Sequence, residues 1–151
     1  MSRAVLIQAI GNAKLFWTAS NATNKITLRL RGEENQSWIL KKIGNHFSIV
    51  NINKEGHELF AVTYNQNSEL TLEPYNPYVP SPQSQRFYIG NKSGQPHPPL
   101  PMAIKSCLDA GHHIVARDGA SEDSQLLTKE FEEMQPVWNI HTIENFINKI
   151  Y

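Results

Sequence analysis

The stretch Asn35-Gln36-Ser37-Trp38-Ile39-Leu40 places a Gln two residues before a Trp, after a polar loop and at the head of an apolar segment. Two weaker versions of it recur, at Gln85-Arg86-Phe87 and at Gln135-Pro136-Val137-Trp138. The three aromatic residues follow one another at a near-constant interval of about 50 residues, which indicates an internally repeated architecture.

Each copy has the same surroundings upstream. A glycine precedes an apolar pair three times, at Gly11, Gly56 and Gly111. Short apolar segments lie before and after these glycines, and we expect them to be strands. They cover residues 4–7, 26–30, 47–50, 70–72, 102–104 and 126–128. With the strands at the glycines and aromatics, the pattern predicts an all-β protein of twelve strands.

This pattern resembles the β-trefoil, and more closely its ricin-B-like branch, which carries a Gln-x-Trp in each repeat. The resemblance covers nearly the whole chain and implies one domain over residues 1–151. Its three pseudo-threefold repeats would lie near 4–43, 47–92 and 102–143. It implies that Trp38, Phe87 and Trp138 are core residues at the barrel floor and that each Gln orders a loop. Two departures stand out: Phe87 replaces a Trp, and an extra residue separates Gln135 from Trp138.

Composition narrows the classes of partner. The 151 residues contain 14 Lys plus Arg and 14 Asp plus Glu, so the chain is neutral and has no basic block. Nucleic acid is therefore not expected as a partner. No apolar run reaches the roughly 20 residues that span a bilayer, so membrane insertion is not expected either. The N-terminal segment does not resemble a signal peptide, and the single Cys107 fits a reducing compartment. We expect a cytoplasmic protein.

Catalytic signatures are missing from the sequence. It contains no Gly-rich phosphate loop, no HExxH and no CxxC. Neighbours on a strand point to opposite faces, so the pair His112-His113 suits one metal site poorly. We interpret the pair as turn residues after Gly111, and Cys107 as a small core residue. The expectation is a non-enzymatic protein without catalytic residues, metal or cofactor.

The resemblance also implies where a ricin-type sugar site would lie, and this sequence does not fill it. The Asp place falls at or near Phe16, Phe60 and Val115. The aromatic place falls near Arg29, Glu73 and Glu130. Only the Asn beside the Gln survives, as Asn35. A galactose site of the ricin type is therefore not expected.

A different sugar site is conceivable in the second repeat. A saccharide site needs a planar apolar face and a few polar groups. Tyr64, Asn65 and Asn67 on a hairpin, with Tyr75 and Tyr78 on a proline-rich loop, form a candidate carbohydrate-binding platform, although the tyrosines could instead pack on their own prolines. Because mushroom β-trefoil lectins of similar length also resemble this chain, we expect a fungal-type lectin whose partners are glycans.

Two other functions stay open. The loop at 73–83 contains four prolines, which stiffen it, and it resembles the proline-rich loop of small mushroom trefoil protease inhibitors. In those inhibitors the loop lies in the third repeat rather than the second. The inhibitory residues would be Pro74, Tyr75, Asn76, Pro77 and Tyr78. Some mushroom trefoil proteins are instead non-catalytic subunits of larger enzymes, so the partner could be a protease or a larger protein.

Overall fold

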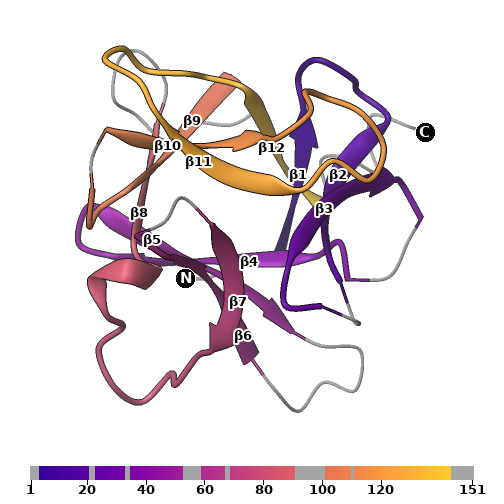
Figure 1. Cartoon of the computed structure of the whole chain (residues 1–151). Coiled ribbons are helices and arrows are strands. Elements are labelled where there is room, and N and C mark those ends of the chain that lie inside the picture. The colour runs from indigo at the N-terminus through magenta and orange to yellow at the C-terminus, as the bar shows by residue number, and fades with distance from the viewer. Residues whose placement is uncertain are drawn as a thin grey trace.

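The computed structural model describes residues 4–20, 23–32, 35–52, 59–66, 69–90, 101–109 and 111–143. These residues form twelve β-strands and one short 3-10 turn (Figure 1). The strands are β1 (Ala4–Ala9), β2 (Leu15–Ala19), β3 (Ile26–Leu30), β4 (Trp38–Ile43), β5 (His46–Ile52), β6 (Leu59–Tyr64), β7 (Leu70–Pro74), β8 (Phe87–Gly90), β9 (Pro101–Ser106), β10 (His112–Ala116), β11 (Leu126–Glu130) and β12 (Trp138–Thr142); the turn is η1 (Gln83–Gln85). The predicted all-β class with twelve strands is confirmed.

Six of the strands form a closed barrel. β1 pairs with β4 on one side and with β12 on the other. The ring continues from β4 to β5, from β5 to β8, from β8 to β9 and from β9 back to β12, and every pairing is antiparallel. Because the ring returns to its first strand, the barrel leaves no strand edge unpaired.

The other six strands form three hairpins, β2–β3, β6–β7 and β10–β11. The hairpins meet one another through short bridges between Thr27 and Gln125 and between Glu69 and Leu127. Four strands, two in the barrel and two in a hairpin, thus recur three times along the chain. This is the β-trefoil with pseudo-threefold repeats that the sequence predicts, whereas the extent of one domain and the repeat boundaries stay predictions.

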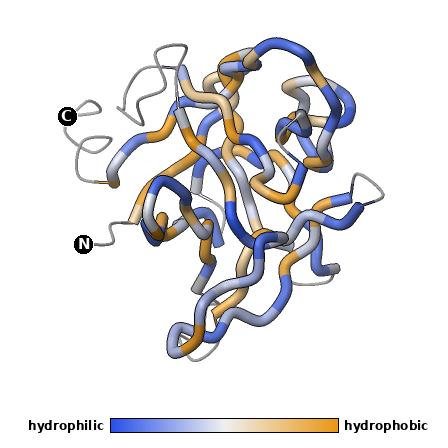
Figure 2. The backbone as a smooth tube through the Cα atoms, turned by 90° about the vertical axis from the view of Figure 1, so that its left-hand side faces the viewer, coloured by the Kyte–Doolittle hydropathy of each residue, from blue (hydrophilic) through white to orange (hydrophobic). Residues whose placement is uncertain are grey.

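Strand alternation agrees with the sequence pattern. Along β3, Ile26 and Leu28 are fully buried while Thr27 and Arg29 are partly exposed, as a strand with one face on the core requires. β7 and β11 begin with the same buried and half-buried alternation. Figure 2 shows hydrophobic and hydrophilic residues interspersed along the chain. None of the described residues belongs to a helix long and apolar enough to cross a membrane.

The three aromatic residues that mark the repeats lie in the core, as the resemblance implies. Trp38 and Phe87 have no exposed surface, and Trp138 is 1% exposed. The indole Nε1 of Trp38 donates a hydrogen bond to the carbonyl of Trp17 at 3.1 Å, and that of Trp138 donates to the carbonyl of Ile114 at 2.9 Å. Both bonds tie the start of a barrel strand to a hairpin of the same repeat.

Trp17 is a core residue that the repeat pattern does not mark. Its buried ring lies edge-on against Trp38, with ring centres 5.9 Å apart, and against Trp138 at 5.2 Å. Edge-to-face contacts of this kind add stability beyond the burial of area. Trp17 Nε1 has no hydrogen-bond partner among the described residues. The central indole therefore acts through its ring alone.

The two buried indoles offer a matched test. We expect Trp138→Phe to reduce the free energy of unfolding by about 1 kcal/mol more than Trp17→Phe, because only the first change leaves a buried carbonyl without its donor. Both changes remove the same volume. Urea unfolding followed by circular dichroism measures the difference, and an equal or larger cost for Trp17→Phe would contradict this role of Ile114.

Candidate functional site

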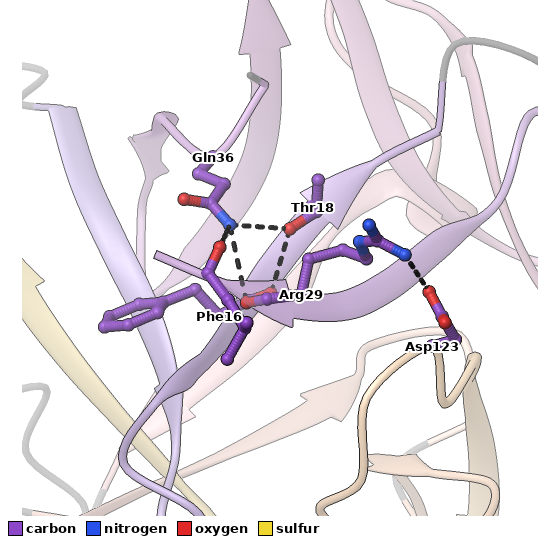
Figure 3. Close-up of polar contacts among 6 residues, drawn as sticks. Phe16, Thr18, Arg29, Gln36 and Asp123 are labelled. Carbon is purple, nitrogen blue, oxygen red and sulfur yellow. Dashed lines mark hydrogen bonds and ion pairs between the residues drawn. The ribbon is translucent and has the colours of Figure 1, made fainter. Parts of the chain in front are cut away.

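Gln36 ties the loop before β4 to the first hairpin (Figure 3). The side chain is buried, and its Nε2 donates to Thr18 Oγ1 at 3.0 Å and to the Leu30 carbonyl at 2.9 Å. Its Oε1 accepts from the backbone N–H of Gly32 at 3.2 Å. Thr18 Oγ1 in turn donates to the Phe16 carbonyl at 3.0 Å. The Gln thus orders this loop, as the resemblance implies.

The second repeat contains the same Gln–Thr contact, and the third does not. Buried Gln85 donates through Nε2 to Thr63 Oγ1 at 3.3 Å. Gln135 instead donates to the nearby carbonyl of Glu133 at 3.3 Å. The extra residue before Trp138 displaces this amide, and the third hairpin has Val115, without a hydroxyl, at the corresponding position.

This correspondence shows that Thr18, Thr63 and Val115 are equivalent positions of the three hairpins. Thr18 and Val115 each follow the residue whose carbonyl accepts the indole hydrogen bond, and Thr63 meets Gln85 as Thr18 meets Gln36. Phe16 and Phe60, which the sequence comparison aligned with Val115, lie before Thr18 and Thr63 on the same strands, so the three expected Asp places are not equivalent positions of the fold. None of Thr18, Thr63 and Val115 is an acid.

Arg29 and Asn35, two polar residues of the first repeat, bond to other residues of the protein. Arg29 forms an ion pair with Asp123, so the first hairpin is bound to the third (Figure 3). Asn35, the residue that survives from the ricin-type set, has a φ of 63°, and its carbonyl accepts from Ala19 N–H at 3.0 Å. Its main-chain role is therefore to close the loop before Gln36.

Where the third repeat meets the first, the structure has an apolar pocket of about 230 Å³. The residues that line it are Ala9, Gly11, Val115, Ala116, Gly119, Ala120, Val137 and Trp138. The only polar side-chain group among the described residues that line this pocket is the indole N–H of Trp138, and it is bonded to the Ile114 carbonyl. The pocket is smaller than most ligand pockets, and nothing in it would sort hydroxyl groups.

The two halves of the predicted carbohydrate platform lie at opposite ends of the second hairpin. Tyr64 pairs with Leu70 next to the turn, whereas Pro74, which precedes Tyr75, pairs with Phe60 at the far end. Five paired residues separate the two ends by roughly 14 Å. The structure therefore does not bring Tyr64 and Asn65 together with Tyr75 and Tyr78.

Tyr64 is a packing residue. It is 3% exposed, its ring lies 5.4 Å from that of His112, and its hydroxyl donates to Asp109 Oδ2 at 3.3 Å. Burial, helped by the nearby Asp109 carboxylate, raises the pKa of Tyr64 above its usual value. Asn65 is also engaged, since its Nδ2 donates to Thr71 Oγ1 at 3.0 Å. Asn67 lies outside the described residues.

The loop from Pro74 to Gln85 contains the exposed half of the platform. Its ends are fixed, because Gln85 Nε2 donates to the Pro74 carbonyl at 3.4 Å and buried Ser81 Oγ lies 3.1 Å from Ser48 Oγ. Between these anchors the chain projects beyond the barrel, as Figure 1 shows between β7 and η1. We call this segment the proline loop. Ser48 comes from β5, 33 residues before Ser81, so no local sequence pattern predicts this anchor.

The tip of the proline loop presents an aromatic ring to solvent. Tyr78 is 93% exposed, and its backbone N–H donates to Asn76 Oδ1 at 2.9 Å, which stabilises the turn. The neighbouring Val79 is 53% exposed. Tyr75 is half-buried, with the ammonium group of Lys41 5.8 Å from its ring centre. The loop thus combines one free ring with one supported ring.

A second concave surface lies where the β4–β5 turn, β8 and β9 meet. It is a groove of about 470 Å³, and sequence reasoning missed it because its residues come from four separate segments. They are Lys42, Asn45, Phe47, Tyr88, Ile89, Gly90, Lys105 and Met134. We call it the lysine groove.

The histidine pair was expected in a turn, and this is wrong, because both residues belong to strand β10. His112 Nε2 lies 3.2 Å from Asp109 Oδ2. His113 is buried, with Nδ1 3.1 Å from the Gly111 carbonyl and its ring edge-on to Phe131. Its Nε2 has no partner among the described residues, and burial lowers its pKa. Within the described ranges, no three His, Cys, Asp or Glu side chains group as a metal site would require.

No protein-family profile and no curated protein sequence matches this chain. Solved structures do match, and they are β-trefoils. A mosquitocidal holotoxin matches with a TM-score of 0.72 and 16% identity, over 94% of this chain and 17% of its own. The designed threefold-symmetric protein ThreeFoil matches at 0.69 and 10% identity, over 93% and 99% of the two chains.

A third structure, the Rhizoctonia solani agglutinin, matches with a TM-score of 0.63 and 10% identity, over 94% of this chain and 96% of its own. At such identities these likenesses show the fold alone, and the chain has the β-trefoil fold. The chain spans only 17% of the holotoxin, so nothing of that protein's activity transfers to it.

The Gln–Thr contact gives a test with an internal control. We expect Gln36→Ala to lower the free energy of unfolding by about 1–3 kcal/mol, because it leaves buried polar groups without partners. Gln135→Ala removes the same side chain from the third repeat and should change stability by less than about 0.5 kcal/mol. Urea unfolding of both variants decides, and equal effects would show that the two amides have equivalent roles.

His113 predicts a pH dependence. Its folded-state pKa lies below the unfolded value of 6.5, so the unfolded chain binds the proton more readily. The contribution of the neutral His113 ring to the free energy of unfolding is fully present above pH 6.5. It is lost as the pH falls from 6.5 toward the folded-state pKa, because the unfolded chain takes up the proton first. We expect the free energy of unfolding to drop between pH 7.5 and 5.5, and less so in His113→Gln. In an NMR titration of the native protein, a His113 midpoint at or above 6.5 would contradict this account.

Proposed function

We propose that this protein binds carbohydrate without catalysing a reaction, as a fungal-type lectin does, and that the proline loop is its contact surface. The observation that carries the proposal is Tyr78, an aromatic ring 93% exposed at the tip of this loop. An exposed ring of this kind matches the apolar face of a pyranose, and an adjacent amide such as that of Asn76 can bond to hydroxyls.

The anchoring of the loop supports the same proposal. Binding costs less entropy when the contact surface is ordered beforehand. The Ser48–Ser81 and Gln85–Pro74 contacts hold both ends, and the prolines restrict the segment between them. Similarity over nearly the full length of both chains to a protein named an agglutinin agrees with a sugar-binding role, and the single Cys107 agrees with a cytoplasmic one.

Protease inhibition is the second candidate, and the same loop favours it. Tyr78 and Val79 are exposed between Pro77 and Pro80, on a segment fixed at both ends. An inhibitor loop has the same requirement for a pre-ordered chain. Residues 73–83 contain no Lys or Arg, so the fitting target is an endopeptidase that cleaves after aromatic residues rather than after basic ones.

A glycan array followed by titration of its best neutral hit tests the first proposal. We expect Tyr78→Ala to weaken that binding by about tenfold, the usual worth of one stacking aromatic ring. Leu108→Ala, which truncates an exposed apolar side chain outside the proline loop and the lysine groove, is the control and should bind as the wild type does.

The same proteins separate the two candidates. An array without any binding removes the lectin proposal. Inhibition of an endopeptidase by the wild type that Tyr78→Ala abolishes would establish the inhibitor instead. A full panel of endopeptidases without inhibition removes that second candidate.

A further inference from the structure

The lysine groove has the size and chemistry of a ligand site. Its volume of about 470 Å³ lies within the usual range for small-molecule pockets. Phe47 and Ile89 provide apolar lining, and Asn45 adds an amide from the β4–β5 turn. Such a mixture of apolar walls with a few polar groups is typical of binding sites rather than of surface irregularities.

The charge of the groove is positive. Lys42 comes from β4 and Lys105 from β9, and none of the described residues that line the groove is acidic. Among the described residues neither ammonium group forms an ion pair with an acid. In a chain with no net charge, two such cations in one concavity make a local attraction for an anion.

Tyr88 gives the groove an aromatic wall whose position is fixed. The ring is 38% exposed, and the ring of His46 meets it edge-on with centres 4.6 Å apart. Lys105 Nζ lies 5.7 Å from the centre of the same ring, so the cation and the ring are already adjacent. A ligand that combines a ring with a negative charge would meet both features at once.

We propose that the lysine groove binds the acidic residue of a saccharide, a pyranose that carries a carboxylate or a sulfate ester. The anionic group lies between Lys42 and Lys105, the sugar ring lies against Tyr88, and Asn45 bonds to a hydroxyl. This inference rests on the proposed carbohydrate-binding function, but it uses none of the residues of the proline loop. The groove therefore adds a second contact that selects acidic glycans.

NMR titration of the ¹⁵N-labelled protein tests the inference with defined probes. The pairs are glucuronate against glucose and galactose 6-sulfate against galactose, with inorganic sulfate as a fifth probe. We expect the two acidic sugars to shift the amide signals of Tyr88, Ile89 and Lys105, and the neutral sugars to leave them in place. Raising the salt from 50 to 500 mM should weaken the acidic sugars several-fold through screening.

Single substitutions assign the contacts. We expect Lys42→Gln and Lys105→Gln each to weaken glucuronate binding by about fivefold, and Tyr88→Ala by about tenfold. Lys14→Gln, which removes an exposed lysine outside the groove, is the charge-matched control and should leave this titration unchanged. All these side chains are at least partly exposed, so the variants should keep the fold, which the amide spectrum itself verifies.

The outcomes separate this inference from the proposed function. Equal shifts from acidic and neutral sugars, or unchanged binding in Lys105→Gln, overturn the groove while leaving the lectin proposal intact. Sulfate that binds as tightly as galactose 6-sulfate overturns the sugar part of the inference. If acidic sugars shift the amide signals of the groove residues while the array shows no neutral glycan that binds, the proposed acidic-sugar site is supported. The role proposed for Tyr78 is then removed.

Discussion

The contact of three indoles holds the architecture together. Trp17 lies edge-on between Trp38 and Trp138, and the latter two donate hydrogen bonds to carbonyls of the first and third hairpins. Hairpins and barrel are thereby joined in two of the three repeats. The second repeat has Phe87, which offers no N–H, and there the Ser48–Ser81 contact ties loop to barrel instead. The same geometric task is thus solved by different chemistry in different repeats.

The three repeats have different polar contacts, and the surface of the protein therefore lacks the threefold symmetry of its backbone. In the first repeat the polar side chains form the hydrogen-bond network around Gln36. In the second repeat Gln85 bonds to Thr63 and to the Pro74 carbonyl and so anchors the proline loop. The third has lost the contact, and an apolar pocket lies beside Val115. Function in such a fold depends on the loops and surfaces of individual repeats, since the shared scaffold does not dictate it. The two proposed contacts accordingly involve unrelated residues.

The fold could be predicted from the sequence because its determinants recur in the chain. Gln36 and Trp38 have counterparts at a fixed interval, and repeated positions reveal a repeated structure. Trp17 has no such counterpart, since Ile114 occupies its place in the third repeat, so its central role required coordinates. The site was harder still. Nearness in sequence suggested that Tyr64 and Tyr75 share a surface, but a hairpin of five residue pairs separates them. The lysine groove joins four segments that no local pattern connects.

The pairing of the first strand with the last has an architectural consequence. β1 and β12 lie side by side over five residue pairs, from Val5 with Thr142 to Ala9 with Trp138. The start of the first strand and the end of the last strand therefore lie next to each other. This arrangement favours insertion of a domain into a loop of another protein, or joining of domains in tandem through short linkers. A circular permutant with its old ends joined and new ends in the β4–β5 turn would retain every barrel pairing.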